Sequence, residues 1–308
     1  MDKHEIREFL VTRRARVTPE QAGLPTFGGE RRVPGLRREE VAMLAGVSVD
    51  YYTRLERGKL GGASESVIEA IARALQLDDA EREHLFDLAR AVEATRSRRP
   101  HVRPQPVVRL SIQRVLDGMD VPAVVRNARL DLVSANEMGR ALYAPHFDTD
   151  RTANIARFIF LDPRARDFYP EWEGAGEISA SMLRIEAGRN PLDADLTALI
   201  GELSTLSLAF RELWARHNVH LHQTGSKHFR HPVVGELHLV FDALELPAER
   251  GLAIDTFSAE SGSPSEDALR LLEAWTATRL TEHSTAWVAA TNRADSPRGA
   301  RPVTNDQD

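Results

Sequence analysis

Polar and planar side chains gather at the start of a short helix that the sequence predicts near residue 50. The stretch LRREEVAMLAGVSVDYYTRLERGK, residues 36–59, indicates two short helices on either side of Gly46, which permits a tight turn between them. Ser48 is a suitable N-cap for the second helix, and Tyr52 and Leu55 supply its inward face. The other side chains at its N-terminal tip have no core to fill, so we expect them to face a partner.

This tip carries Val49, Asp50, Tyr51 and, one turn later, Arg54. The major groove of DNA accepts a helix of this kind, with short side chains against base edges and cations beside them for phosphates. Val49 suits a thymine methyl group, and Asp50 suits a cytosine amine if it pairs with Arg54. We expect these four residues to read bases, while the base sequence stays open. Candidate phosphate contacts are Arg31, Arg32, Arg38, Ser48, Arg57 and Lys59.

The first of the two helices has to position this tip. Its predicted apolar stripe is Val41, Leu44 and Ala45, and Val47 fills the angle between the helices. An isolated turn of this kind is more often an ordinary helical hairpin. The DNA interpretation therefore depends on the supporting helices and on the basic loop at residues 26–38.

Composition places the chain among soluble proteins of more than one domain. It has 308 residues, of which 42 % are hydrophobic and 28 % charged, and it contains no cysteine, which excludes disulfides and zinc-thiolate sites. The absence of long apolar runs and the charged start MDKHEIREFL predict a cytoplasmic protein without a membrane partner. Residues 1–106 hold 19 Lys and Arg against 17 Asp and Glu, which gives a net charge of +2. Because the whole chain has a net charge of −6, the remaining residues carry −8. The N-terminal part is the better partner for a polyanion.

The apolar pattern divides the chain into two domains. Residues 1–94 predict an all-α domain of five helices. Residues 95–107 mix arginine with proline, a composition typical of a stiff, extended linker. Residues 108–284 mix strands with helices, and the polar residues 285–308 predict a disordered tail. The predicted strands are 123–126, 130–134, 219–225, 226–234, 235–244 and 250–260; the predicted helices begin at Asn136, span 155–217 and cover 263–280. Strands on both sides of a helical insert favour one mixed sheet covered by helices.

Residues 36–58 resemble the Cro/repressor-like helix-turn-helix of the xenobiotic-response-element type. The resemblance implies a positioning helix over 36–45 and a recognition helix over 48–57, with Arg38 where the family usually has Gln. The positions that carry it are Leu36, Glu39, Glu40, Val41, Ala42, Leu44, Ala45, Gly46, Val47, Ser48, Arg54, Leu55, Glu56, Arg57 and Gly58.

Past the linker, RLDLVSANEMGRALY, FIFLDPRARDFYPEWE and GSKHFRHPVVGELHLVFDAL resemble the ligand-binding domain of the MmyB-like transcription regulators. That resemblance implies a PAS-like α+β fold that holds a fatty acid. The candidate lining is Phe158, Phe160, Trp172 and Phe210, for which core packing is the plainer interpretation. The candidate anchors for a carboxylate, which spacing does not rank, are Arg157, Arg211, His217 and His231.

Metal and enzyme interpretations find less support. Six of the eleven histidines fall between His217 and His238, yet no Asp or Glu lies among the first five, so we expect no metal and no cofactor. GSK at Gly225 lacks the glycine five residues earlier that a phosphate-binding loop needs, and the common nucleophile and dinucleotide motifs are absent.

The leading hypothesis is a one-component regulator that binds double-stranded DNA as a homodimer and senses a small, fatty-acid-like ligand. One alternative is a protein-interaction adaptor that keeps the helical domain without binding DNA. Another is an enzyme that modifies acyl chains. A gel shift with DNA would support the regulator over the adaptor. Turnover of a lipid retained by the protein would support the enzyme over the regulator.

Overall fold

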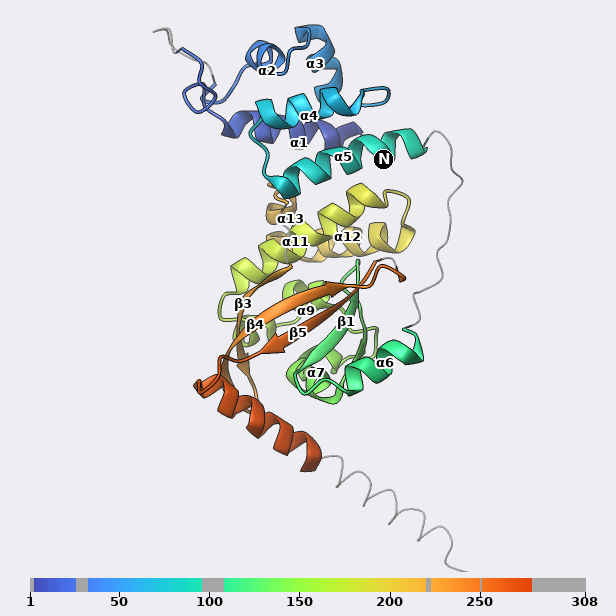
Figure 1. Ribbon diagram of the computed structural model, residues 1–308, viewed down its shortest axis with the longest axis vertical. Helices are drawn as coiled ribbons and strands as arrows, with labels where there is room; N and C mark the ends of the chain where they lie inside the picture. The colour runs from blue at the N-terminus through green and yellow to red at the C-terminus, as the bar shows by residue number, and fades with distance from the viewer. Residues whose placement is uncertain (1–2, 26–32, 96–107, 220–222, 250, 279–308) are drawn as a thin grey trace, which may run out of the picture.

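The protein has a helical domain at one end and a sheet domain at the other, with helices of the second domain between them (Figure 1). A computed structural model describes residues 3–25, 33–95, 108–219, 223–249 and 251–278. The expected linker therefore lies almost wholly, and the expected tail entirely, outside the described residues.

Five helices form the first domain within its described residues, as the sequence predicts. Their buried faces meet in one apolar cluster that includes Phe9, Leu36 and Ile71, all 0 % exposed. Ser64 caps the fourth helix, because its side chain accepts the backbone N–H of Val67. The helices are α1 (Lys3–Arg16), α2 (Arg38–Leu44), α3 (Val49–Glu56), α4 (Glu65–Ala74) and α5 (Asp79–Thr95).

The second domain is built on an antiparallel sheet of five strands in the order β2-β1-β5-β4-β3. One face of the sheet carries the apolar side chains Val124, Phe229 and Phe257, which form the main core of this domain with the helices above them. This confirms the predicted α+β class. The strands are β1 (Ala123–Asn127), β2 (Leu132–Ala135), β3 (Thr224–His231), β4 (Gly235–Glu245) and β5 (Leu252–Ser258).

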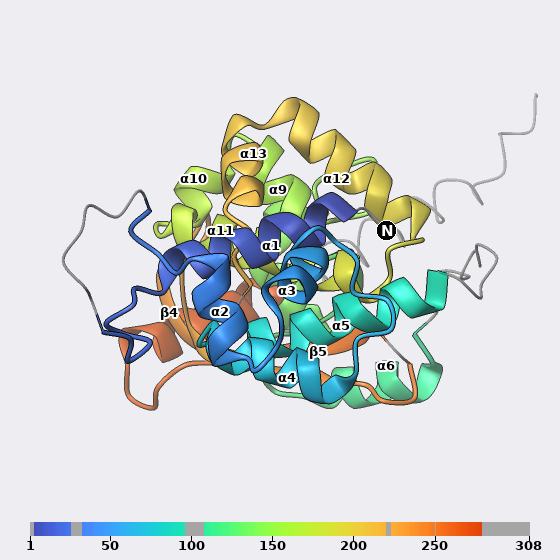
Figure 2. The same ribbon diagram turned by 90° about the horizontal axis from the view of Figure 1, so that it is seen from above.

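Helices cover the two faces of this sheet unequally. Helix α6 packs on one face, where Leu116 meets Val125 and Ile254. The helical insert between β2 and β3 packs on the other face, and Figure 2 shows α12 and α13 on the side away from α6. The helices are α6 (Leu110–Asp117), α7 (Glu137–Leu142), α8 (Ala144–Phe147), α9 (Ile155–Leu161), α10 (Ala165–Phe168), α11 (Trp172–Arg189), α12 (Ala194–Leu206) and α13 (Leu208–Ala215), followed by a helix over residues 264–278.

Several predicted strand boundaries differ from the structure: the run expected at 130–134 is observed as β2 and the run expected at 250–260 as the shorter β5. The run expected at 226–234 ends as a strand at His231, because Pro232 has no N–H for a ladder and the His231 ring accepts the backbone N–H of Val233 at 3.2 Å. The run expected at 219–225 falls partly outside the described residues, and its last two residues belong to β3.

Helix α7 lies so close to β1 that only glycine fits at residue 139. A Cβ there would stand 2.1 Å from the carbonyl oxygen of Ala123. We therefore expect Gly139→Ala to lower the free energy of unfolding by about 3 kcal/mol, measured by urea denaturation. Gly174→Ala is the matched control, because a Cβ at that position meets nothing within 4 Å. Equal losses in the two variants would contradict the close approach.

Candidate functional site

A tight turn presents the tip of α3 to solvent. Gly46 takes φ of +66°, a conformation that favours glycine, and the backbone N–H of Val47 donates to the carbonyl of Ala42 at 2.9 Å. Ser48 is the N-cap of α3, since its Oγ accepts the N–H of Tyr51 at 3.1 Å. The local signals in the sequence therefore predict this turn correctly.

The buried stripe of α2 differs by one position from the expected one. Val41, Ala42 and Ala45 are buried, whereas Leu44 is 38 % exposed. Helix α2 is only seven residues long, and the small Ala42 rather than Leu44 faces the core shared with α3 and α4.

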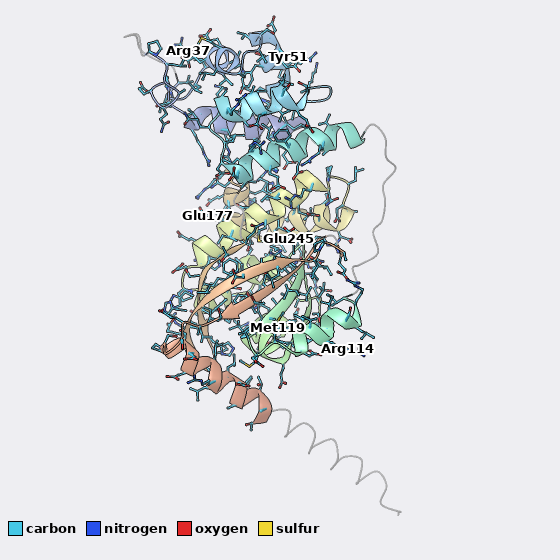
Figure 3. All side chains as sticks on the ribbon, viewed as in Figure 1. Arg37, Tyr51, Arg114, Met119, Glu177 and Glu245 are labelled. Carbon is cyan, nitrogen blue, oxygen red and sulfur yellow. The ribbon has the colours of Figure 1, made fainter. Side chains whose placement is uncertain are left out.

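The four expected base-reading residues lie together at the tip of α3. Asp50 and Arg54 are exposed, Val49 is 46 % exposed, and Tyr51 is half-buried. The guanidinium of Arg54 lies 4.9 Å from the centroid of the Tyr51 ring, so its neighbour is this ring rather than the expected Asp50. Figure 3 shows Tyr51 at the end of the molecule away from the sheet domain.

The expected phosphate contacts differ in their surroundings. Arg57 and Lys59 are exposed beside the end of α3, and Ser48 uses its oxygen as the cap. Arg38 is half exposed but donates to the buried carboxylate of Glu56 at 2.7 Å. Arg31 and Arg32 lie outside the described residues.

Glu56 is a functional position whose role the sequence reasoning missed. Its carboxylate is 1 % exposed and also accepts a hydrogen bond from Arg14 of α1 at 2.9 Å. Burial alone would raise the pKa of Glu56, but the hydrogen bonds from Arg14 and Arg38 hold this pKa below its ordinary value. A charged Glu56 thus fixes α3 to α1 and α2, which sets the direction of the tip.

A cavity of about 110 Å³ lies between the sheet and helices α9 and α11. Aliphatic side chains of the helices form one wall, and polar side chains of β1, β3 and β5 form the other. The lining is Arg126, Leu130, Ile155, Ile159, Tyr169, Glu171, Gly174, Ala175, Ile178, Ser179, Met182, Ser226, Lys227, His228 and Asp255. We call this space the inner cavity.

Lys227, a half-buried residue of β3, supplies a cation to the inner cavity. Its Nζ lies 4.7 Å from the ring centroid of Phe241 and 5.7 Å from that of Phe257. Burial lowers the pKa of Lys227 to about 8, although nearby Asp255 opposes this shift. Arg126 pairs with Oδ2 of Asp255 at 2.8 Å, whereas Oδ1 of Asp255 is buried without a hydrogen-bond partner among the described residues.

The four aromatic residues expected to line the ligand site do not line the inner cavity. Phe158, Phe160 and Phe210 are buried in the core, where Phe158 stacks on His146 at 3.8 Å and Phe160 meets Phe210 edge-on at 5.0 Å. The indole N–H of Trp172 donates to the carbonyl of Ile159 at 2.8 Å. Core packing is thus their role in this structure.

The four expected anchors also lie elsewhere. Arg157 pairs with Glu202 at 2.9 Å, and Arg211 is exposed on α13. His231 faces the carbonyl of Ala141 at 3.0 Å, and His217 lies at the contact between the two domains.

A larger cleft of about 470 Å³ lies between the two domains. Glu83 of α5 borders it on one side, and Glu245 and Leu246 at the end of β4 border it on the other. Arg126 and Met182 line both this outer cleft and the inner cavity. These two side chains therefore separate the two spaces.

Two buried arginines join the domains. Arg13 of α1 donates to the backbone carbonyl of His217 and pairs with Glu81 at 2.9 Å. Arg184 of α11 lies 3.0 Å from Nδ1 of the same histidine and packs on the Trp214 ring. Burial lowers the pKa of each arginine to about 10.

Helix α5 lies directly on α11. Arg189 pairs with Asp87 at 2.9 Å and with Glu83 at 2.8 Å. His84 is 1 % exposed and packs closely against Gly188. A Cβ at residue 188 would stand 2.7 Å from the His84 ring. Neither ring nitrogen of His84 has a hydrogen-bond partner among the described residues.

Metal ligation and membrane insertion have no visible basis in the described part of the chain. No group of three His, Asp or Glu side chains there could hold a metal ion, and His228 stacks on His238 at 4.0 Å. None of the described helices combines the length and the apolar composition that a membrane span needs.

Two family models match the chain. Residues 6–85 match a helix-turn-helix domain, and residues 108–272 match the ligand-binding domain of MmyB-like transcription regulators. No curated protein matches the chain significantly. The two matched ranges correspond to the helical and the sheet domain.

The buried histidines at the domain contact predict a pH-dependent stability. Burial lowers the pKa of both His84 and His217 to about 3, while the unfolded chain returns them to about 6.5. The unfolded state therefore binds more protons below pH 6.5, and stability falls as the pH falls from there towards 3. We expect a loss of up to about 2 kcal/mol per histidine between pH 7 and pH 5, measured by urea denaturation.

The variant His84→Leu should show roughly half of this pH dependence. The exposed His238→Leu is the control and should retain the wild-type slope. A wild-type free energy of unfolding that stays flat from pH 7 to pH 5 would show that the two imidazoles do not stay neutral on folding.

Proposed function

This chain belongs to the MmyB-like transcription regulators, and we propose that it is a one-component regulator that binds double-stranded DNA through α3. The observation that supports this most directly is the exposed tip of α3, which the buried Glu56 network holds in place. Val49, Asp50, Tyr51 and Arg54 would read bases. The DNA partner would place this activity in the cytoplasm.

The cations around the tip support phosphate contact on both sides of the groove. Arg57 and Lys59 are exposed and follow the helix, while Arg38 keeps part of its guanidinium in solvent. A contact of this kind gives affinity without sequence information. In this proposal Ser48 serves mainly as the N-cap, and its hydroxyl hydrogen remains able to donate to a phosphate.

We also propose that the inner cavity takes the carboxylate of a fatty-acid-like ligand. Lys227 is the anchor, because its ammonium lies over the rings of Phe241 and Phe257 and forms no ion pair with the described residues. Ile155, Ile159 and Ile178 supply the apolar wall for the first carbons of the chain. This assigns the anchor to β3 instead of the four residues that the sequence suggested.

The length of the ligand chain is limited by the cavity. A volume of about 110 Å³ is well below the roughly 300 Å³ of typical ligand pockets. A longer chain would have to pass between Arg126 and Met182 into the outer cleft, which has about 470 Å³. Displacing Met182 would move the middle of α11, whose end contacts the DNA-binding domain through Arg189. Ligand control of DNA binding would follow this path.

The DNA assignment is tested by gel shifts with the DNA upstream of the chain's own gene. Arg54→Ala should weaken binding about tenfold or more, because it removes a base contact. Arg57→Ala should lower the slope of the logarithm of the binding constant against the logarithm of salt concentration by about 1, because it removes a phosphate contact. Arg216→Ala, on the surface of the sheet domain, is the charge-matched control. No shift at low salt with any genomic fragment would favour the adaptor.

The ligand assignment is tested by calorimetry with decanoate and by native mass spectrometry of the purified protein. Lys227→Met should weaken decanoate binding about tenfold or more, because it removes the charge that pairs with the carboxylate. Arg211→Met, which replaces an exposed arginine outside the cavity, should bind as the wild type does. Equal affinity in all three proteins would contradict the anchor, and turnover of a retained lipid would favour an enzyme.

A further inference from the structure

One face of the sheet domain exposes apolar side chains on two neighbouring elements. On β4, Val240 is 46 % exposed and Leu244 is 48 % exposed. On α6, Leu110 is 78 % exposed and Val115 is 52 % exposed. Both elements belong to the sheet face opposite α9 and α11.

Val240 and Leu244 depart from the usual pattern of a strand that has one face on the core and the other in solvent. Leu237, Leu239 and Phe241 alternate into the core and are at most 1 % exposed. The intervening positions should then be polar, because water covers that face. Val240 and Leu244 are apolar instead, although no described helix covers them.

Helix α6 departs from its pattern in the same way. Its inward side chains Ile112 and Leu116 pack on β1 and β5, and an amphipathic helix would carry only polar groups on the other side. Leu110 and Val115 lie on that outer side. Figure 1 shows α6 beside the strands on the face turned to the viewer, where it leaves β4 uncovered.

Charges beside these apolar residues are complementary. Arg114 precedes Val115 on the outer side of α6, and Figure 3 shows it at the edge of the molecule. Asp242 stands between Val240 and Leu244 on β4. In the described part of the chain, neither Arg114 nor Asp242 forms an ion pair.

We propose that a second copy of this chain docks on this surface, which we call the α6–β4 face: Leu110, Arg114, Val115, Val240, Asp242 and Leu244. Helix α6 of each copy packs on the open β4 of the other, so that Arg114 meets Asp242 twice across a two-fold axis. Such an isologous contact closes at two copies because each copy supplies both halves.

The position of the face suits the function that we propose, and the inference rests on that function. The α6–β4 face lies along the side of an elongated molecule, and α3 lies at one end of it (Figure 1). A two-fold axis parallel to the long dimension therefore brings both α3 helices to the same end. Helix-turn-helix dimers require this arrangement to contact two half-sites.

Sedimentation equilibrium of the full chain tests the proposal by charge exchange. The wild type should be a dimer, and Arg114→Glu or Asp242→Arg alone should raise the dimer dissociation constant about tenfold or more. The double variant Arg114→Glu with Asp242→Arg should restore dimerisation, which a folding defect would not allow. Glu212→Arg, an exposed reversal on α13, is the control and should leave the constant unchanged.

Leu244→Asp separates this inference from the proposed function. It should give a monomer that still binds a single half-site in gel shifts, with lower affinity for the two-fold site. A wild type that is monomeric with and without DNA would overturn the proposal, as would a dimer that resists Leu244→Asp and both charge reversals, because another surface would then hold it. Loss of half-site binding in the wild type would instead contradict DNA recognition itself.

Discussion

Helix α11 contacts both the inner cavity and the DNA-binding domain. Ile178 and Met182 in its middle line the inner cavity, and Ile185 joins the core of the DNA-binding domain. Small residues make this possible. A Cβ at Gly176 would stand 3.2 Å from Leu213, and one at Gly188 would enter the His84 ring. A displacement of α11 would therefore change the packing in both domains.

The buried charged and polar side chains at the contact between the domains lose hydration free energy there. Arg13 and Arg184 lose water on docking, and their hydrogen bonds to His217 and its backbone recover part of that loss. His84 recovers less, because both its ring nitrogens are buried without partners.

The extent to which the sequence predicts each site follows from how local its signals are. The turn at Gly46 and the cap at Ser48 are set by neighbours a few residues away, so the recognition helix could be placed correctly. The inner cavity combines Arg126, Lys227 and Asp255, which only the sheet order brings together. In the sequence Lys227 stood out only within an incomplete phosphate-loop pattern. Its role as the proposed anchor depends on its position in the sheet beside Arg126 and Asp255, which spacing does not reveal.

The inner cavity is lined by charged groups of both signs. Arg126 and Lys227 supply cations, Asp255 and Glu171 supply carboxylates, and Arg126 pairs with Asp255 at 2.8 Å. Burial lowers the pKa of Lys227, and nearby Asp255 opposes this shift only in part. A ligand carboxylate beside Nζ, as we propose, would raise this pKa again. In this proposal the ligand also contacts α11, which pairs with α5 of the DNA-binding domain through Arg189.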